Sequence, residues 1–156
     1  MEKTDVGVLK PEAIQSKIFT IRGVQVMIDR DLAELYGVET KALNQAVKRN
    51  PERFPKHYCF QLTNLERDEV VTNCDHLSNL RFSYQMPYAF TEFGVSMLAS
   101  VLRGETAAKI SIQIIDSFVS MRRFLYENAA IFQRLDTLER KQLETDGKHL
   151  RPIPIL

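Results

Sequence analysis

Hydrophobic and polar positions along the chain change their spacing several times, and each spacing predicts a different element. Residues 17–28 form two runs rich in β-branched side chains on either side of Arg22 and Gly23. This pair suits a tight turn because glycine tolerates positive φ, so we expect a β-hairpin. Residues 58–63 alternate apolar and polar side chains, which predicts a half-buried strand, and residues 87–90 are its expected partner.

Apolar residues at helical spacing mark the remaining elements. Residues 29–36 and 41–50 each carry a short apolar stripe, and Gly37 separates them. Pro51 and Pro55 end the second helix because proline cannot donate the backbone hydrogen bond that a helix needs. Further helices are expected after a cap at Thr63 or Asn64, after a cap at Thr91 to just before Gly104, and from about Glu105 to at least Tyr126.

These elements predict one α+β domain with a small antiparallel sheet, a helix-turn-helix and a long C-terminal helix. The sheet is expected to combine the hairpin with the strand pair. Residues 72–85 have no sustained period, which predicts a loop or a ribbon. The expected organisation is a tail at 1–13, a DNA-binding domain at 14–126, a helical extension at 127–147 and a second tail at 148–156.

Composition narrows the class of protein. The apolar share of 44% and the charged share of 26% are those of an average soluble globular protein. No segment reaches the roughly 18 consecutive apolar residues of a membrane span, and residues 1–10 lack the apolar stretch of a secretory signal. Cys59 and Cys74 are too few for a disulfide framework. We therefore expect a cytoplasmic protein with reduced thiols and no membrane partner.

Charge is balanced overall but not locally. A net charge of +1 argues against a polycation that coats nucleic acid. Residues 41–57, however, contain five lysines and arginines against the single acid Glu52. Such a local excess indicates either a nucleic-acid contact or an ordinary solvated surface.

Residues 29–48 fit two helices that cross tightly. Ala33 is small where the second helix would approach, and Gly37 permits a left-handed turn residue. Thr40 is expected to cap the second helix. The expected core contacts of the pair are Leu32, Tyr36, Leu43, Ala46 and Val47.

The opposite face of the second helix carries Lys41, Asn44, Gln45 and Lys48 at i, i+3, i+4 and i+7. Asparagine and glutamine can pair bidentately with adenine, and lysine can reach guanine or a phosphate. We expect alanine at position 44 or 45 to weaken binding to a preferred site without lowering thermal stability. A plain helical hairpin with a polar surface is the alternative.

Residues 79–86 offer a second candidate contact. Arg81 with Phe82 and Tyr84 is a mixture that a β-ribbon uses against a DNA backbone or minor groove, although aromatic packing on the core explains it equally well. The complete set of candidate DNA-binding residues is Thr40, Lys41, Asn44, Gln45, Lys48, Arg49, Arg53, Lys56 and Arg81.

Several motifs together resemble the KilA-N superfamily, most closely the phage-type amino-terminal branch of antirepressor-like and prophage proteins. The resemblance covers about residues 14–126 and implies sequence-specific binding of double-stranded DNA in the regulation of a phage or mobile element. It departs at residues 147–156, which lack the continued charged helix expected of the family. The motifs are Leu32-Ala-Glu-Leu-Tyr-Gly-Val38, Arg49-Asn50, Phe54-Pro55, Phe60-Gln-Leu62 and Pro87-Tyr-Ala-Phe-Thr-Glu-Phe-Gly-Val-Ser-Met-Leu98.

Catalytic and metal sites are not expected. The chain has no G-x-S-x-G, no glycine-rich phosphate loop and no H-E-x-x-H, so we do not expect an enzyme or a cofactor. His57-x-Cys59 and Cys74-x-His76 could meet as a zinc site, but their spacing is not that of a usual zinc knuckle. A thiol on a sheet and a histidine near phosphates are simpler explanations.

Two protein partners remain open. The basic helical face could grip a repressor, which would make the chain a protein-binding antirepressor or adaptor. A homodimer is also expected, through a heptad-spaced seam whose first four positions could instead pack in the domain's own core. The seam consists of Ile114, Phe118, Met121, Leu125, Asn128, Phe132 and Leu135.

Overall fold

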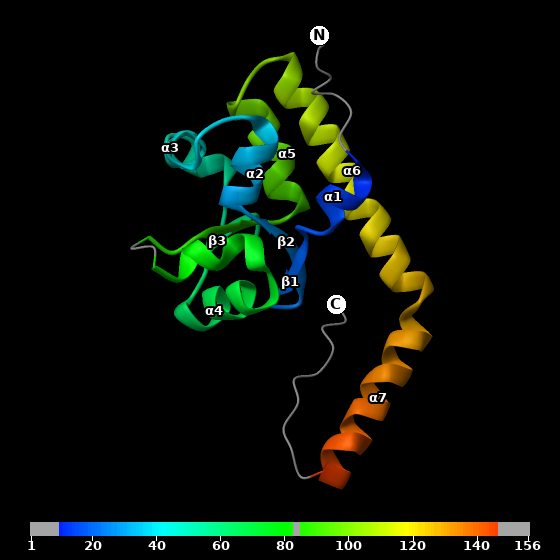
Figure 1. The fold of residues 1–156 in the computed structure, drawn as a ribbon. Coiled ribbons are helices and arrows are strands. Elements are labelled where there is room, and N and C mark those ends of the chain that lie inside the picture. The colour runs from blue at the N-terminus through cyan, green and yellow to red at the C-terminus, as the bar shows by residue number, and fades with distance from the viewer. Residues whose placement is uncertain (1–9, 83–84, 147–156) are drawn as a thin grey trace.

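The computed structural model describes residues 10–82 and 85–146 and has an α+β architecture, which confirms the fold class (Figure 1). Four short antiparallel strands form one sheet in the order β1-β2-β4-β3. The expected hairpin and strand pair are thus joined, because β4 pairs with both β2 and β3. The strands are β1 (Phe19–Ile21), β2 (Val24–Ile28), β3 (Cys59–Gln61) and β4 (Tyr88–Phe90).

The hairpin turn has the backbone geometry that its sequence predicts. Arg22 and Gly23 both have positive φ, 56° and 76°, which is the combination of a two-residue type I′ turn. The Arg22 guanidinium contacts both carboxylate oxygens of Glu66 at 2.8 and 3.0 Å and lies 4.1 Å from the centre of the Phe60 ring. The turn is therefore tied to the helix that follows β3.

Helices cover both faces of the sheet. The helical segments are α1 (Pro11–Gln15), α2 (Asp29–Tyr36), α3 (Thr40–Lys48), η1 (Pro51–Arg53), α4 (Asn64–Asn73), η2 (Asp75–Phe82), α5 (Glu92–Val101), α6 (Glu105–Glu127) and α7 (Ala129–Asp146). η1 and η2 are 3₁₀ helices. α1 overlaps the end of the segment that the sequence assigned to a tail, and η2 corrects the expected loop or ribbon at residues 75–82.

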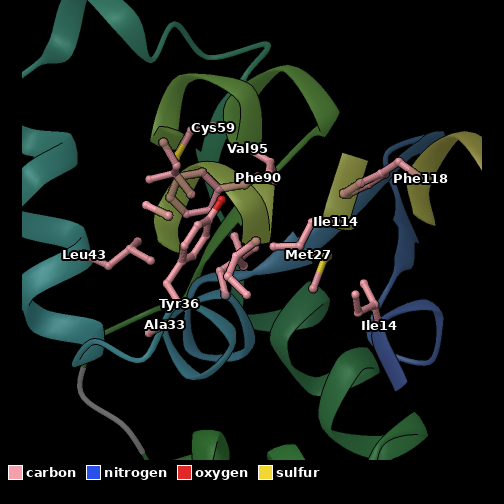
Figure 2. Close-up of a cluster of buried hydrophobic side chains, with 14 of the residues drawn as sticks. Ile14, Met27, Ala33, Tyr36, Leu43, Cys59, Phe90, Val95, Ile114 and Phe118 are labelled. Atoms are coloured by element: carbon pink, nitrogen blue, oxygen red, sulfur yellow. The ribbon is translucent and has the colours of Figure 1, made fainter. Parts of the chain in front are cut away.

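The side chains of the sheet alternate between two cores. Met27, Cys59 and Phe90 face the larger core, which α1, α2, α3, α5 and α6 complete (Figure 2). Ile28 and Phe60 face the smaller core under α4 and η2. The expectation of a half-buried strand at β3 is wrong, because Cys59, on the face that was expected to meet water, packs in the larger core, while Phe60 on the other face packs under α4 and η2.

The start of α5 approaches the sheet very closely. Thr91 caps α5, as expected, by accepting a hydrogen bond from the Gly94 amide, and its own amide donates to the Tyr58 carbonyl at 3.0 Å. A Cβ at Gly94 would lie 2.3 Å from that same carbonyl oxygen. The Thr-Glu-Phe-Gly stretch therefore has a packing reason: only glycine lets α5 reach β3 at this point.

The long C-terminal helix is α6. Ile114 and Phe118 are almost fully buried in the larger core, so the first two positions of the heptad seam pack within the domain. α6 ends at Glu127, Asn128 has a non-helical backbone, and α7 then projects away from the sheet (Figure 1). The side chain of Phe132 lies outside the described residues.

Candidate nucleic-acid interface

α2 and α3 are joined by a tight turn with the expected conformation. Gly37 ends α2 in the left-handed region with φ of 72°, as predicted. Its amide donates to the Glu34 carbonyl, and the Val38 amide donates to the Ala33 carbonyl at 3.0 Å. These two bonds satisfy the last carbonyls of α2 and redirect the chain into α3.

α3 packs on the larger core through one side. Leu43 is completely buried, whereas Lys41, Gln45 and Lys48 are exposed on the opposite side. Thr40 is the first residue of α3 rather than its cap; the cap position is Glu39, which makes no side-chain capping bond. The expectation that Thr40 caps the helix is therefore wrong, and Thr40 instead lines a groove.

This groove has a volume of about 580 Å³ and runs beside α3. One wall is the polar face of α3. The floor and far wall come from the first turn of α2 and from the segment that joins η2 to β4. Its described lining residues are Asp29, Arg30, Thr40, Lys41, Asn44, Gln45, Lys48, Asn79, Leu80, Gln85, Met86 and Pro87.

Asn44 differs from its neighbours on this face. It is only partly exposed, and its amide nitrogen donates a 2.9 Å hydrogen bond to Oδ2 of Asp29, a residue that is 4% exposed. Burial raises the pKa of Asp29, and the Asn44 hydrogen bond acts in the opposite direction. Asn44 therefore holds α3 against the start of α2, so the expectation of an unchanged thermal stability after its removal does not fit its position.

The opposite wall of the groove is anchored to the same turn of α2. Asp31 is 2% exposed, and its Oδ1 lies 3.0 Å from Nε2 of His76 in η2. Burial likewise raises the pKa of Asp31, while the charge of His76 opposes the shift. Two buried aspartates two residues apart thus hold the two walls: Asp29 holds α3, and Asp31 holds η2.

Positive charge lies along and beyond the groove. Arg30, Lys41 and Lys48 line it. The remaining basic candidates do not. Arg49 and Lys56 are exposed outside it, and Arg53 donates a hydrogen bond to the Ser100 hydroxyl of α5 at 2.7 Å. Arg81 lies in η2, but its side chain is outside the described residues, as is all of Tyr84.

Sequence reasoning missed several residues of the groove. The sequence pattern indicates Asp29 and Arg30 only as the beginning of a helix, and Pro87 only as the beginning of a strand. No periodicity connects residues 79–87 with α3, because the two meet only through the fold. An acid at each of two positions in the first turn of α2 was a visible signal, although it equally suits the helix dipole.

A second, smaller hollow of about 260 Å³ lies near the start of α5. Phe93 is 58% exposed and stacks on Tyr58 with ring centres 5.5 Å apart. Glu92 pairs with Arg122 of α6 at the same place. Val24 and Phe118 add apolar surface to the lining.

Within residues 10–82 and 85–146, no three histidine, cysteine or acidic side chains are grouped so that they could hold a metal ion. Cys59 faces the larger core and Cys74 packs against the smaller one, so the sheet separates the two halves of the zinc site considered from sequence. None of the helices in these ranges combines the length and the hydropathy of a transmembrane span.

Fold and site together define an α+β domain in which a tightly turned helix pair presents a basic and amide face beside a groove. Comparison with protein-family models matches residues 16–101, more than half of the chain, to the ORF6N domain. The chain therefore belongs to the ORF6N domain family, which is associated with bacteriophages. The matching model is not one for KilA-N, the family that the sequence motifs resemble. No curated protein and no solved structure matches.

Proposed function

We propose that the protein binds double-stranded DNA sequence-specifically, with α2 and α3 acting as a helix-turn-helix and α3 as the reading helix. The observation that carries the proposal is the groove beside α3, where Gln45 stands between Lys41 and Lys48 on an exposed face. A major groove is wide enough to admit a helix, and these side chains match the donors and acceptors of base edges. Asn44 is not one of the proposed base-contacting residues, because its hydrogen bond to Asp29 positions α3.

Charge outside the groove supports the same orientation. Arg49, Arg53 and Lys56 follow α3 directly and are exposed, so they lie where a duplex entering beside α3 would present its phosphates. Arg30 adds a cation from the first turn of α2. Phosphate contacts of this kind set the position and the salt dependence of binding, while base contacts supply the sequence preference.

The family suggests where such binding is used. ORF6N is a phage-associated domain, and the sequence motifs also resemble the KilA-N superfamily. We infer that the chain regulates transcription of a prophage or mobile element in the cytoplasm, and that it acts by binding rather than by catalysis. Membership in the KilA-N superfamily is part of this proposal.

Homodimerisation through α7 belongs to the same proposal. Ile131, Leu135 and Leu138 lie at i, i+4 and i+7 on α7 and are all about half exposed. A single amphipathic helix that projects into water is marginally stable alone, so this stripe needs a partner surface. A second copy fits best, because paired modules read two half-sites and double the contacted length of DNA.

The deciding experiment is a selection of duplexes from random DNA with the full chain, read by sequencing. A shared motif among the selected duplexes, together with an affinity that falls steeply with salt, is the expected result. Binding that is equal on selected and scrambled duplexes would contradict sequence-specific reading. No detectable binding at low salt would contradict the DNA interface altogether.

A protein-binding antirepressor is the second candidate function. The observation that favours it is the hollow at the start of α5, where the exposed Phe93 ring lies on Tyr58. Exposed aromatic side chains in such hollows are frequent anchors of protein interfaces. Phe93→Ala that abolishes capture of a phage repressor while leaving DNA affinity unchanged would favour this function over the first.

A further inference from the structure

A thiol, an imidazole and a carboxylate lie in one hydrogen-bonded row outside the groove. Sγ of Cys74 lies 3.3 Å from Nδ1 of His76, and Nε2 of His76 lies 3.0 Å from Oδ1 of Asp31. Cys74 and His76 come from the junction of α4 and η2, whereas Asp31 comes from the first turn of α2. This is the order in which a nucleophile, its base and the group that orients the base are arranged in activated thiols.

The row assigns the proton positions on the imidazole. An ionised Asp31 can only accept a hydrogen bond, so Nε2 of a neutral His76 carries the hydrogen and donates it. Nδ1 then presents its lone pair to the Cys74 thiol. The nitrogen nearest the sulfur is therefore the one that can take a proton from it.

Asp31 favours a positive charge on His76. Its side chain is 2% exposed, and its second oxygen, Oδ2, is buried with no hydrogen-bond partner among the described residues. His76 and Lys17 provide the positive charges that act on this carboxylate, and Glu34 adds a negative one. A buried carboxylate left half unsatisfied is stabilised when its neighbour becomes cationic, so proton transfer from sulfur to His76 is favoured.

The backbone around Cys74 does not supply this stabilisation. Cys74 directly follows Asn73, the last residue of α4, where the free carbonyls of the helix disfavour a negative charge. The Cys74 carbonyl accepts a 3.1 Å hydrogen bond from the Leu77 amide. This bond belongs to the backbone of η2 and does not involve the sulfur. The His76 imidazole, 3.3 Å from the sulfur, is the basic group placed to take the proton.

We propose that Cys74 is a nucleophilic thiol that forms mixed disulfides with low-molecular-weight disulfides, with His76 as its proton acceptor and Asp31 as the positioning residue. The Cys74 proton moves to Nδ1 of His76. The thiolate then attacks one sulfur of the small disulfide, forming a protein–sulfur bond and breaking the original S–S bond. The released small thiolate takes up the proton. The Cys74 thiol and the small disulfide are thus converted into a mixed disulfide and a small thiol, with no net oxidation.

The second cysteine provides a reference within the same chain. Cys59 is 8% exposed in the larger core, and burial raises the pKa of its thiol to about 12. Cys74 is only partly buried and the His76 side chain beside it is 39% exposed, so we expect a small reagent to reach the sulfur. In the folded chain only Cys74 should react.

The test is the reaction of the folded full chain with 5,5′-dithiobis(2-nitrobenzoate), followed by absorbance from about pH 6 to pH 9. We expect one fast equivalent per chain, absent in Cys74→Ser, and a second equivalent from Cys59 only after unfolding. His76→Gln keeps an N–H donor beside Asp31 but removes the base. At about pH 6.5 this variant should react at least about tenfold more slowly, because no imidazole is left to take the proton from the thiol, and the thiolate is the reactive form.

Two results would overturn the proposal. One is a rate profile of the unmodified chain that coincides with that of His76→Gln. The other is a profile that coincides with that of a synthetic peptide of residues 70–78, which contains Cys74 and His76 but not Asp31. The peptide comparison decides the matter even where circular dichroism shows that His76→Gln is unfolded. Neither measurement depends on DNA binding. A negative result here would therefore leave the proposed function untouched, and a failure of the proposed function would leave this inference untouched.

Discussion

The side-chain amide of Asn44 donates a 2.9 Å hydrogen bond to the buried carboxylate of Asp29. This bond joins the middle of α3 to the first residue of α2, across the turn at Gly37. It takes Asn44 away from the set of side chains that are free to read bases. The angle at which α3 presents Lys41, Gln45 and Lys48 therefore depends on a contact inside the protein.

Replacing Asn44 and Gln45 separately should distinguish a residue that stabilises the position of α3 from one that contacts DNA bases. Asn44→Ala is expected to lower the free energy of unfolding by about 1–3 kcal/mol, because the Asp29 carboxylate loses a buried partner. Gln45→Ala changes an exposed side chain, so its stability should stay within about 0.5 kcal/mol while affinity for the selected duplex falls. Denaturant unfolding and titration of both variants measure the two effects. Equal stability of the two variants would contradict the structural role of Asn44.

Gly94 should not tolerate a methyl group. Gly94→Ala would place its Cβ 2.3 Å from the Tyr58 carbonyl oxygen, so α5 must move away from β3. Overpacking against backbone costs about 1–3 kcal/mol, which thermal unfolding would detect as a lower Tm. Ser96→Ala, at an exposed position of the same helix, is the matched control and should be neutral. A Gly94→Ala protein as stable as this control would be inconsistent with the close approach.

Gly37 tests the turn through backbone conformation alone. Nothing lies within 4 Å of a Cβ built on Gly37, so Gly37→Val introduces strain from the positive φ without a clash. We expect a loss of about 1–2 kcal/mol, and a smaller loss for Gly37→Asn because asparagine visits the left-handed region more readily. Chemical denaturation of both variants gives the comparison. A valine variant no less stable than the asparagine variant would argue against the left-handed turn.

Glu66 should make a pH-dependent contribution to stability. The Arg22 hydrogen bond holds the pKa of Glu66 below its usual value of 4.5, so its charge stabilises the folded state above that value. The contribution is lost as the pH falls through the lower, folded-state pKa. Glu66→Gln keeps the capping contact with Thr63 but removes the charge, and should cost about 0.5–1 kcal/mol at pH 7, given the partly exposed pair. Unfolding curves of the two proteins should converge in acid; a constant difference would contradict the ion pair.

Truncation tests pairing through α7. A chain stopped after Tyr126 removes Ile131, Leu135 and Leu138 but keeps the buried Ile114 and Phe118 of α6. Light scattering at tens of micromolar should give a dimer for the full chain and a folded monomer for the shorter one. A double variant, Leu135→Glu and Leu138→Glu, should reproduce the monomer without shortening the chain. A dimeric truncated chain would place the interface elsewhere.

Local sequence was sufficient to predict those elements whose stabilising interactions join residues close together in the chain. Several predicted features depend only on residues a few positions apart, and all of them agree with the structure. They are the Arg22-Gly23 turn, the left-handed Gly37, the caps at Thr63 and Thr91 and the extent of α2. The alternation of residues 58–63 also located β3. It did not reveal that both faces are covered, because the helices of the larger core meet the Cys59 face only in the folded chain.

The sequence by itself determined the α+β class, the helix pair and the basic, amide-bearing face of α3. Only the tertiary structure decided which of those side chains are available to contact a ligand, because it buried Asp29 beside Asn44. It also brought residues 79–87 opposite α3 and placed His76 on Asp31. These partners are separated by 15 to 45 positions, so no periodicity relates them. Their meeting follows from the packing of two cores on opposite faces of one sheet, which is a property of the whole chain.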